Sequence, residues 1–181
     1  GSGAPVIAGA PTSTGNGYWL ARTDGTVDAH GDAQHHGDMR GTALNASIVG
    51  MTVSPSGGGY WMVAQDGGIF SFGDADYFGS TGAMVLNQPV VDMTVTSTGQ
   101  GYWLVASDGG VFSFGDANYW GSTGSINLNQ PMVSMTAGAD GYWLVARDGG
   151  VFRFGSAVDA GSAANLLFMG EQAVDLLVLQ R

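Results

Sequence analysis

Residues 101–115 read GYWLVASDGGVFSFG, and close copies of this stretch occupy 17–31, 59–73 and 141–155. The tryptophans of the four copies are separated by 42, 42 and 40 residues, and they are Trp19, Trp61, Trp103 and Trp143. A fixed period near 40 residues predicts a repeat architecture, in which each unit buries its apolar faces against its neighbours. The short apolar runs and frequent turn residues predict that each unit is built from β-strands.

One repeat can be divided into strands from its pattern. Residues 89–95 alternate and are rich in β-branched side chains, 102–107 form a second apolar run, and 111–114 form a third. The short aromatic segment 118–121 is a candidate fourth strand. Turn residues separate the runs, so the unit is predicted to be an antiparallel sheet.

The dipeptide Asp108-Gly109 suits the two positive-φ positions of a type I′ hairpin turn. A two-residue loop would pair Trp103 with Phe114 and Val105 with Phe112. Both faces of the resulting hairpin are apolar, which predicts that the sheet is sandwiched between other sheets. The repeated tryptophan is then first of all a core residue.

The repeat resembles repeats found in secreted and surface proteins of actinobacteria. The resemblance rests on the order PVVxMTV, a turn, GYWLVAxDGGVFxFGDA, and then an aromatic residue with Gly-Ser, and it extends from about Pro5 to Val178. The layout is also similar to the blades of NHL-type β-propellers, in which a Pro-led inner strand precedes a hairpin. This resemblance implies a propeller-like architecture and an extracellular setting, and it brings no catalytic residues.

These patterns predict an all-β fold, a β-propeller-like array of four repeats of about 41 residues. The inner-strand motif occurs five times but the Tyr-Trp hairpin only four. A capped open stack of β-repeats and a propeller completed by oligomerisation are therefore the alternatives. The expected division is a tail typical of a cloning remnant at 1–4 and a single domain at 5–181, with repeats at 5–46, 47–88, 89–130 and 131–171 and a closing strand at 172–181.

Composition and motifs exclude several partners and chemistries. The net charge is −10, so the surface repels phosphate backbones and no nucleic-acid partner is expected. No apolar run reaches the length of a membrane-spanning helix, and no membrane insertion is expected. The chain has no cysteine, which removes thiolate chemistry. It also contains no phosphate loop, nucleophile elbow or zinc-protease motif, which favours a non-enzyme.

The first repeat departs from the other three. Asp28 and His30 stand where the others have phenylalanine, and His35 and His36 stand where the middle repeats have aromatic residues. An end repeat that has become polar explains this pattern. The alternative is a site for a divalent transition metal such as Zn²⁺, Ni²⁺ or Cu²⁺, with His30, His36, Asp28 and Asp32 as ligands, because imidazole and carboxylate suit these ions. No other cofactor is expected.

The predicted function is a non-catalytic extracellular recognition module. Tyr, Trp, Asp and Gly recur at strand ends, and these residue types stack on sugar rings and accept hydrogen bonds from hydroxyl groups. A glycan or a cell-wall component is therefore the expected partner of a secreted or cell-surface protein. The candidate ligand-binding residues are Tyr77, Tyr119, Trp120 and Asp76, since the end repeats lack these aromatic side chains.

Two other functions stay open. A structural or assembly module of a larger surface protein is favoured by the fifth inner-strand motif, because an unpaired edge strand invites pairing with another chain. Self-association through edge strands is the partner that this function implies. A metal-binding protein, acting through the His and Asp residues of the first repeat, is the second alternative.

Overall fold

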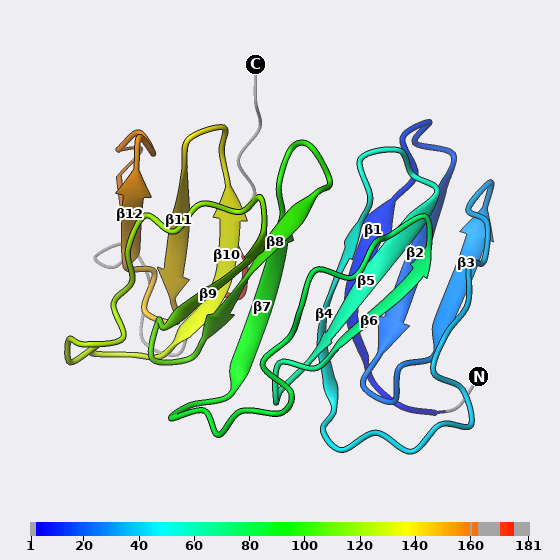
Figure 1. Cartoon of the computed structure of the whole chain (residues 1–181), viewed down its shortest axis with the longest axis horizontal. Coiled ribbons are helices and arrows are strands. Elements are labelled where there is room, and N and C mark those ends of the chain that lie inside the picture. The colour runs from blue at the N-terminus through cyan, green and yellow to red at the C-terminus, as the bar shows by residue number, and fades with distance from the viewer. Residues whose placement is uncertain (1–2, 160, 163–170, 176–181) are drawn as a thin grey trace.

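The computed structural model describes residues 3–159, 161–162 and 171–175. In this part of the chain there are twelve strands and no helix, and thus no helix that is long and apolar enough to cross a membrane. The strands form four three-stranded antiparallel sheets, here called blades 1 to 4, which follow one another along the chain (Figure 1). The predicted all-β array of four repeats is confirmed.

Each blade has an inner, a middle and an outer strand. Blades 1 and 2 contain β1 (Val6–Pro11), β2 (Gly17–Arg22) and β3 (Val27–Gly31), then β4 (Ile48–Val53), β5 (Gly59–Ala64) and β6 (Ile69–Gly73). Blades 3 and 4 contain β7 (Val90–Val95), β8 (Gly101–Ala106) and β9 (Val111–Gly115), then β10 (Met132–Ala137), β11 (Gly141–Ala146) and β12 (Val151–Gly155). The candidate fourth strand at 118–121 is not a strand, and its last residue, Gly121, has a φ of +132°.

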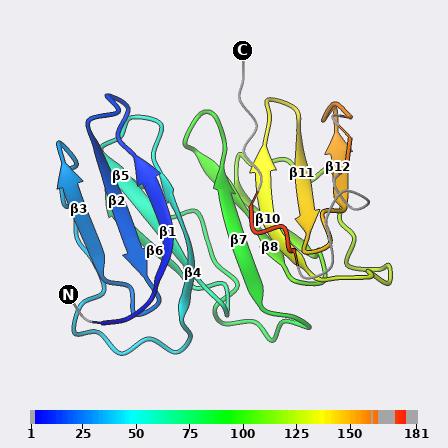
Figure 2. The same ribbon diagram turned by 180° about the vertical axis from the view of Figure 1, so that it is seen from behind.

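The array of four blades is open. The inner strands contact one another in the order β1, β4, β7, β10 and line a central cavity of about 330 Å³. Blade 1 and blade 4 lie at opposite ends of the molecule, with β3 and β12 farthest apart, when it is seen from the front and from behind (Figure 2). The four blades therefore form a curved segment and not a closed ring.

The hairpin inside each blade differs from the predicted two-residue turn. Tyr102 pairs with Phe114 and Trp103 with Ser113, one residue out of the predicted register. The loop holds residues 107–109, and only its glycine has a positive φ, of +78°. A type I′ turn needs positive φ at both central residues, which the aspartate does not adopt. A three-residue loop with glycine in the left-handed region is the next common hairpin.

The observed register gives every blade two distinct apolar faces. The leading face, defined here as the one that packs on the preceding blade, carries in blade 3 the side chains of Tyr102, Leu104, Phe112 and Phe114. The trailing face, which packs on the following blade, carries Trp103, Val105 and Val111. Alternation along a strand explains this division, since successive side chains point to opposite faces. The predicted sandwiching of a sheet that is apolar on both sides is confirmed.

Each junction between blades is centred on a tryptophan and a tyrosine. The ring of Trp61 lies 6.0 Å from that of Tyr102 in the next blade, and the other two junctions repeat this contact at 6.2 and 5.9 Å. The Tyr102 hydroxyl donates to the Gly79 carbonyl at 2.6 Å and accepts the Phe78 N–H at 3.1 Å. The hydroxyl therefore stays hydrogen-bonded although the ring is fully buried.

A glycine in each linker lets the next blade approach closely. Gly79 has a φ of +135°, and a Cβ there would lie 2.5 Å from a ring carbon of Phe114. Gly37 and Gly121 meet the phenylalanines of blades 2 and 4 in the same way. Only glycine combines this backbone conformation with this contact.

The tryptophans are core residues, as predicted. Trp19, Trp61 and Trp103 are buried, and each indole N–H donates to a backbone carbonyl 15 residues along the chain at 2.7 Å. Burial of the ring with its N–H satisfied contributes apolar contact without leaving a polar atom unpaired.

The predicted closing strand at 172–181 lies partly outside the described residues, which end at Asp175. Residues 171–175 are not a β-strand. The Ala173 N–H nevertheless donates to the Arg147 carbonyl at 2.9 Å, as Met132 at the start of β10 donates to Ser107 at 2.8 Å. Residues 173–175 thus enter the position that an inner strand takes at each earlier junction.

We expect the tyrosine hydroxyl to stabilise a junction specifically. Tyr102→Phe would leave the Gly79 carbonyl and the Phe78 N–H without this partner in a partly buried site, and the free energy of unfolding should fall by about 1–3 kcal/mol. Tyr18→Phe is the matched control, because Tyr18 stands at the same position in blade 1 and is exposed. Urea denaturation of both variants measures the difference. Equal, small effects would show that the hydroxyl contributes nothing at the junction.

Candidate functional site

The carboxylates of the predicted metal site already have partners. Asp28 accepts hydrogen bonds from the Arg22 guanidinium at 2.7 and 2.9 Å, and this contact lowers the pKa of the Asp28 carboxyl. Asp32 accepts the hydroxyls of Thr14 and Thr12, which lower its pKa. Asp74 accepts the same pair of hydroxyl contacts in blade 2, from Ser54 and Ser56, and Asp116 accepts them in blade 3, from Thr96 and Thr98. The recurring aspartate therefore fixes a turn.

The two histidines of the predicted metal site lie against aromatic rings. His30 stacks on Tyr18, with ring centroids 4.9 Å apart. His36 packs between Trp19 and Tyr60, at 6.2 and 5.6 Å, where the middle repeats have Phe78 and Trp120. In the part of the chain that the structure describes, no group of three His, Cys, Asp or Glu side chains is close enough to hold a metal ion. The geometry gives the metal hypothesis no support.

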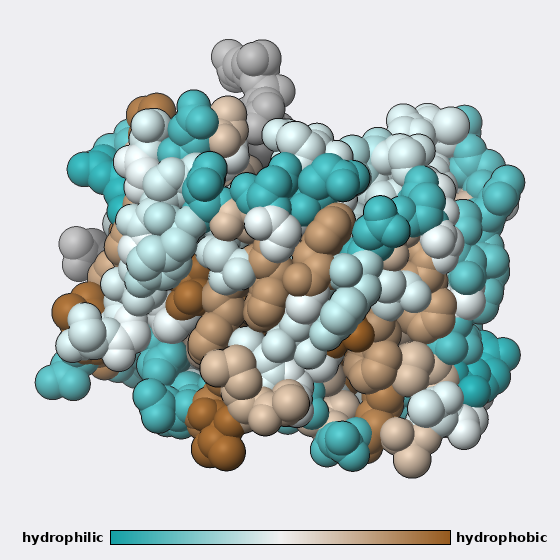
Figure 3. Space-filling view, in the orientation of Figure 1, coloured by the Kyte–Doolittle hydropathy of each residue, from teal (hydrophilic) through white to brown (hydrophobic). Residues whose placement is uncertain are grey.

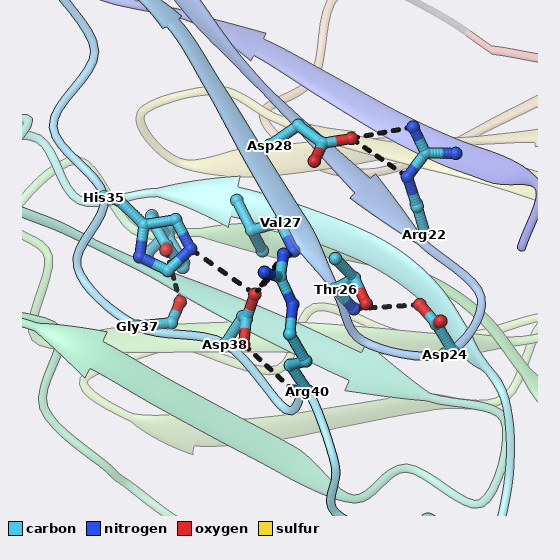
Figure 4. A network of polar contacts seen from close by, with 10 residues as sticks. Arg22, Asp24, Thr26, Val27, Asp28, His35, Gly37, Asp38 and Arg40 are labelled. Carbon is cyan, nitrogen blue, oxygen red and sulfur yellow. Dashed lines mark hydrogen bonds and ion pairs between the residues drawn. The ribbon is translucent and has the colours of Figure 1, made fainter. Parts of the chain in front are cut away.

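The third histidine belongs to a polar network at the outer edge of blade 1 (Figure 4). His35 Nε2 lies 3.4 Å from Asp38 Oδ2. Asp38 also accepts the backbone N–H groups of Arg40 and Val27, at 2.9 and 3.3 Å. The network ties the linker after blade 1 to β3, so its groups serve the fold.

The predicted ligand residues divide into two groups. Tyr77 and Tyr119 occupy equivalent positions in blades 2 and 3, and 60% and 59% of their surfaces are exposed. Their hydroxyls contact Ser80 and Ser122 at 3.1 and 3.2 Å. The structure therefore presents two equivalent tyrosine rings to solvent, one on each middle blade.

The other two predicted ligand residues serve the blade junctions. Trp120 is half-buried and stacks on Trp103 at 5.4 Å, and it also contacts Tyr142 at 5.3 Å. Asp76 has an exposed side chain, and its backbone carbonyl accepts the indole N–H of Trp61. Trp120 thus contributes to the core between blades 3 and 4.

Two open clefts, called the polar clefts here for the turn aspartate and amide side chains that both contain, lie at the ends of the hairpins. One of about 510 Å³ is lined by Thr23, Asp24, Thr42, Leu44, Asn45, Ala46, Ser47 and Gln65. The other, of about 450 Å³, is lined by Gln88, Ser107, Asp108, Ile126, Asn127, Leu128 and Pro131. The two walls share equivalent turn aspartates and linker leucines. Sequence reasoning missed these clefts because they combine a hairpin turn with a linker far from it in sequence. The recurring Leu-Asn of the linkers was the available signal.

The central cavity contains a carboxylate in an unusual environment. Asp92 Oδ2 accepts the Met135 N–H at 2.8 Å and the Ser134 hydroxyl at 3.0 Å, and Oδ1 accepts the Met93 N–H. Desolvation by burial raises the pKa of Asp92 to about 6, and the nearby charge of Asp175 acts in the same direction. Asp175 Oδ1 lies 2.5 Å from the same Ser134 hydroxyl. One hydroxyl proton thus stands between two carboxyl groups.

Sequence reasoning missed this cluster as well. Asp92 and Ser134 occupy the same position in the inner strands of blades 3 and 4, where blades 1 and 2 have Ala8 and Gly50. The sequence does show that this position differs between the repeats. That the differing side chains contact one another depends on the curvature of the array, which brings the inner strands together.

Comparison with known proteins identifies the fold. No protein-family model and no curated protein match the sequence. Among solved structures, the β-propeller domain of Cps50 (Swd1) from Myceliophteria thermophila is similar over 83% of this chain, with a TM-score of 0.59 and 11% sequence identity. The fold is β-propeller-like. The chain spans 52% of that propeller domain, which agrees with an open array of blades.

We expect Asp92 to make stability depend on pH in a defined window. Because its pKa rises from 3.8 to about 6 on folding, the folded state holds the proton more tightly than the unfolded state. This contribution is present in full below pH 4 and is lost as the pH rises through 6, by about 1–3 kcal/mol. Carboxyls with lowered pKa values, such as Asp28 and Asp32, act at lower pH and in the opposite direction.

The contribution of Asp92 is measured by comparing the free energy of unfolding of the wild type with that of Asp92→Asn between pH 4.5 and 7.5. The difference should change in favour of the variant as the pH rises. A difference that is independent of pH in this window would show that Asp92 titrates as an ordinary aspartate.

Proposed function

We propose that this chain is a non-catalytic recognition module that binds saccharides in its polar clefts. The observation that carries the proposal is the repetition of a cleft, about 510 and 450 Å³ in volume, with equivalent turn aspartates Asp24 and Asp108. A function that depends on one reactive centre would need one distinctive site, whereas repeated binding of similar sugar units is served by repeated clefts.

The lining of the clefts supports a ligand rich in hydroxyl groups. Thr23, Asn45, Ser47 and Gln65 offer hydroxyl and amide groups in the first cleft, and these groups both donate and accept hydrogen bonds. The turn carboxylates add strong acceptors. Leu44 and its counterpart in the second cleft supply apolar surface for the faces of sugar rings. Both clefts are wide and open, so we expect weak affinity at each site. A ligand that binds both clefts at once would have a higher overall affinity.

The exposed rings of Tyr77 and Tyr119 are proposed as separate stacking surfaces for the same ligand. They lie one repeat apart, so a polymer with a regular spacing could contact both. The resemblance of the repeats to those of actinobacterial surface proteins supports a location at the cell surface or outside the cell, with a cell-wall glycan as the natural ligand.

A titration followed by ¹⁵N NMR tests the proposal, with soluble N-acetylglucosamine oligomers and neutral cell-wall oligosaccharides as probes. We expect millimolar binding with shift changes at both clefts. The double variant Asp24→Asn/Asp108→Asn keeps the oxygens that accept the Thr26 and Gly110 N–H groups, and it should bind at least tenfold more weakly. Asp148→Asn is the matched control, since Asp148 holds the same turn in blade 4 and lines neither cleft.

A second variant separates the tyrosines from the clefts. Tyr77→Ser/Tyr119→Ser should leave the melting temperature nearly unchanged, because both rings are exposed, and should weaken binding of the longer oligomers only. If no saccharide binds at 10 mM, or if Asp148→Asn weakens binding as much as the cleft variant, saccharide recognition by the clefts is wrong.

Assembly is a second candidate function, and the two ends of the array favour it. Tyr18 is 46% exposed, whereas its counterparts in the other blades are fully buried. Trp143 at the other end is half-buried, whereas Trp19, Trp61 and Trp103 are buried. In the part of the chain that the structure describes, apolar surface that is covered at three junctions is thus partly exposed on blades 1 and 4.

A further inference from the structure

The chain contains three copies of one interface. At each junction the tryptophan and the linker glycine of a trailing face meet the tyrosine and the ring at the phenylalanine position of the next leading face. The tyrosine hydroxyl donates to the carbonyl of the linker glycine every time. A surface that contains one half of this interface is therefore complementary to a surface that contains the other half.

The leading face of blade 1 presents the tyrosine half without a partner blade. Tyr18 is exposed, and His30, which stands at the phenylalanine position, stacks on it with an interplanar angle of 25°. Val6 is also exposed, whereas the first residues of the other inner strands, Ile48, Val90 and Met132, are buried. The ring of Tyr18 is thus held in place by His30 and faces solvent.

The trailing face of blade 4 presents the tryptophan half. A cavity of about 180 Å³ beside Trp143 is lined by Val151, Arg153, Val158, Asp159 and Gly161. Gly161 is the counterpart of Gly121 and has a φ of +93°, and no atom of the described residues lies within 4 Å of the position that its Cβ would take. At the internal junctions, the corresponding glycines lie against the phenylalanine ring of the next blade.

We propose that a second copy of this chain occupies these faces head to tail. Tyr18 of one copy packs on Trp143 of the other, its hydroxyl donates to the Gly161 carbonyl, and His30 lies over Gly161. The inference goes beyond saccharide recognition, because it concerns the ends of the array and not its clefts. It is supported by the three internal junctions, each of which contains the same contact between a tryptophan and a tyrosine of neighbouring blades.

The curvature of the array favours a closed pair over an endless fibre. Four blades span 52% of a propeller domain, so two copies supply about the number of blades that one ring needs. A twofold axis through the centre of the ring would make both junctions identical. A head-to-tail interface that closes in this way gives a dimer and cannot add further copies.

Residues 173–175 mark the inner-strand position of the new junction. The Ala173 N–H bonds to Arg147, and Asp175 bonds to Ser134 as Asp92 does. In the proposed pair, β1 of the partner takes this position beside β10 while it stays paired with its own β2, as each inner strand is paired within its blade.

The charge of the chain sets the conditions of the experiment. Each copy carries −10, so long-range repulsion opposes association at low ionic strength and is screened at higher salt. Analytical ultracentrifugation of the 181-residue chain from 5 to 500 µM, in 0.05 and 0.5 M NaCl, should show a monomer–dimer equilibrium that salt strengthens. A monomer throughout this range would overturn the proposal, as would a series of species larger than the dimer.

Two single variants damage opposite halves of the interface. Tyr18→Ser and Trp143→Ala should each weaken the dimer at least tenfold, while Tyr77→Ser, which changes an exposed tyrosine away from the end faces, should not. Far-UV circular dichroism and melting curves establish that each variant is folded. Val158→Asp replaces Trp143→Ala if that variant unfolds, because Val158 is exposed in the single chain and lines the cavity that would receive the partner's ring.

Mixing the two variants distinguishes head-to-tail association from other modes. A mixed pair contains one junction in which both Tyr18 and Trp143 are intact, so an equimolar mixture should associate more tightly than either variant alone. A mixture that associates no better than the separate variants contradicts the head-to-tail arrangement. This outcome leaves saccharide binding untouched, since both clefts are unchanged in every variant.

Discussion

The contact between the tryptophan of one blade and the tyrosine of the next is the interaction on which the structure depends. A single three-stranded sheet that is apolar on both faces is unstable in water, because both apolar faces would be exposed. Stacking the blades covers these faces. At one junction the rings of Trp61 and Tyr102 pack with their centroids 6.0 Å apart, and the Tyr102 hydroxyl donates a hydrogen bond to the preceding linker. The linker glycine then sets how closely the blades approach. The regular spacing of the blades follows from repeating this contact at all three junctions.

Much of this fold could be predicted from the sequence. The period of 40 to 42 residues, the alternating strands and the two-faced apolar pattern together gave four stacked sheets, and the burial of Trp19, Trp61 and Trp103 agrees with their predicted place in the core. The register of the hairpin was wrong by one residue. The turn sequence is compatible with two loop lengths, and packing of Tyr102 and Phe114 on one face, against the preceding blade, favours the longer one.

The sites could be predicted far less well, for a physical reason. Whether an aromatic side chain is exposed depends on where the next blade lies. Tyr119 is exposed to solvent, whereas its neighbour Trp120 packs on Trp103 at a junction. His36 was a candidate ligand by type, but it takes the place of a junction ring. The polar clefts and the Asp92–Ser134–Asp175 cluster join segments that are distant in sequence. The pattern of residues within one segment does not show which distant segments it contacts in the fold.

A double-mutant cycle across one junction tests the central claim most directly. Trp61→Leu and Tyr102→Leu, alone and together, should show a coupling free energy of about 0.5–1.5 kcal/mol in urea denaturation. Trp61→Leu combined with Tyr142→Leu, which belongs to the next junction, should be additive within about 0.5 kcal/mol. Additivity of the adjacent pair, or equal coupling in the distant pair, would contradict the view that direct contact between these two rings holds the blades together.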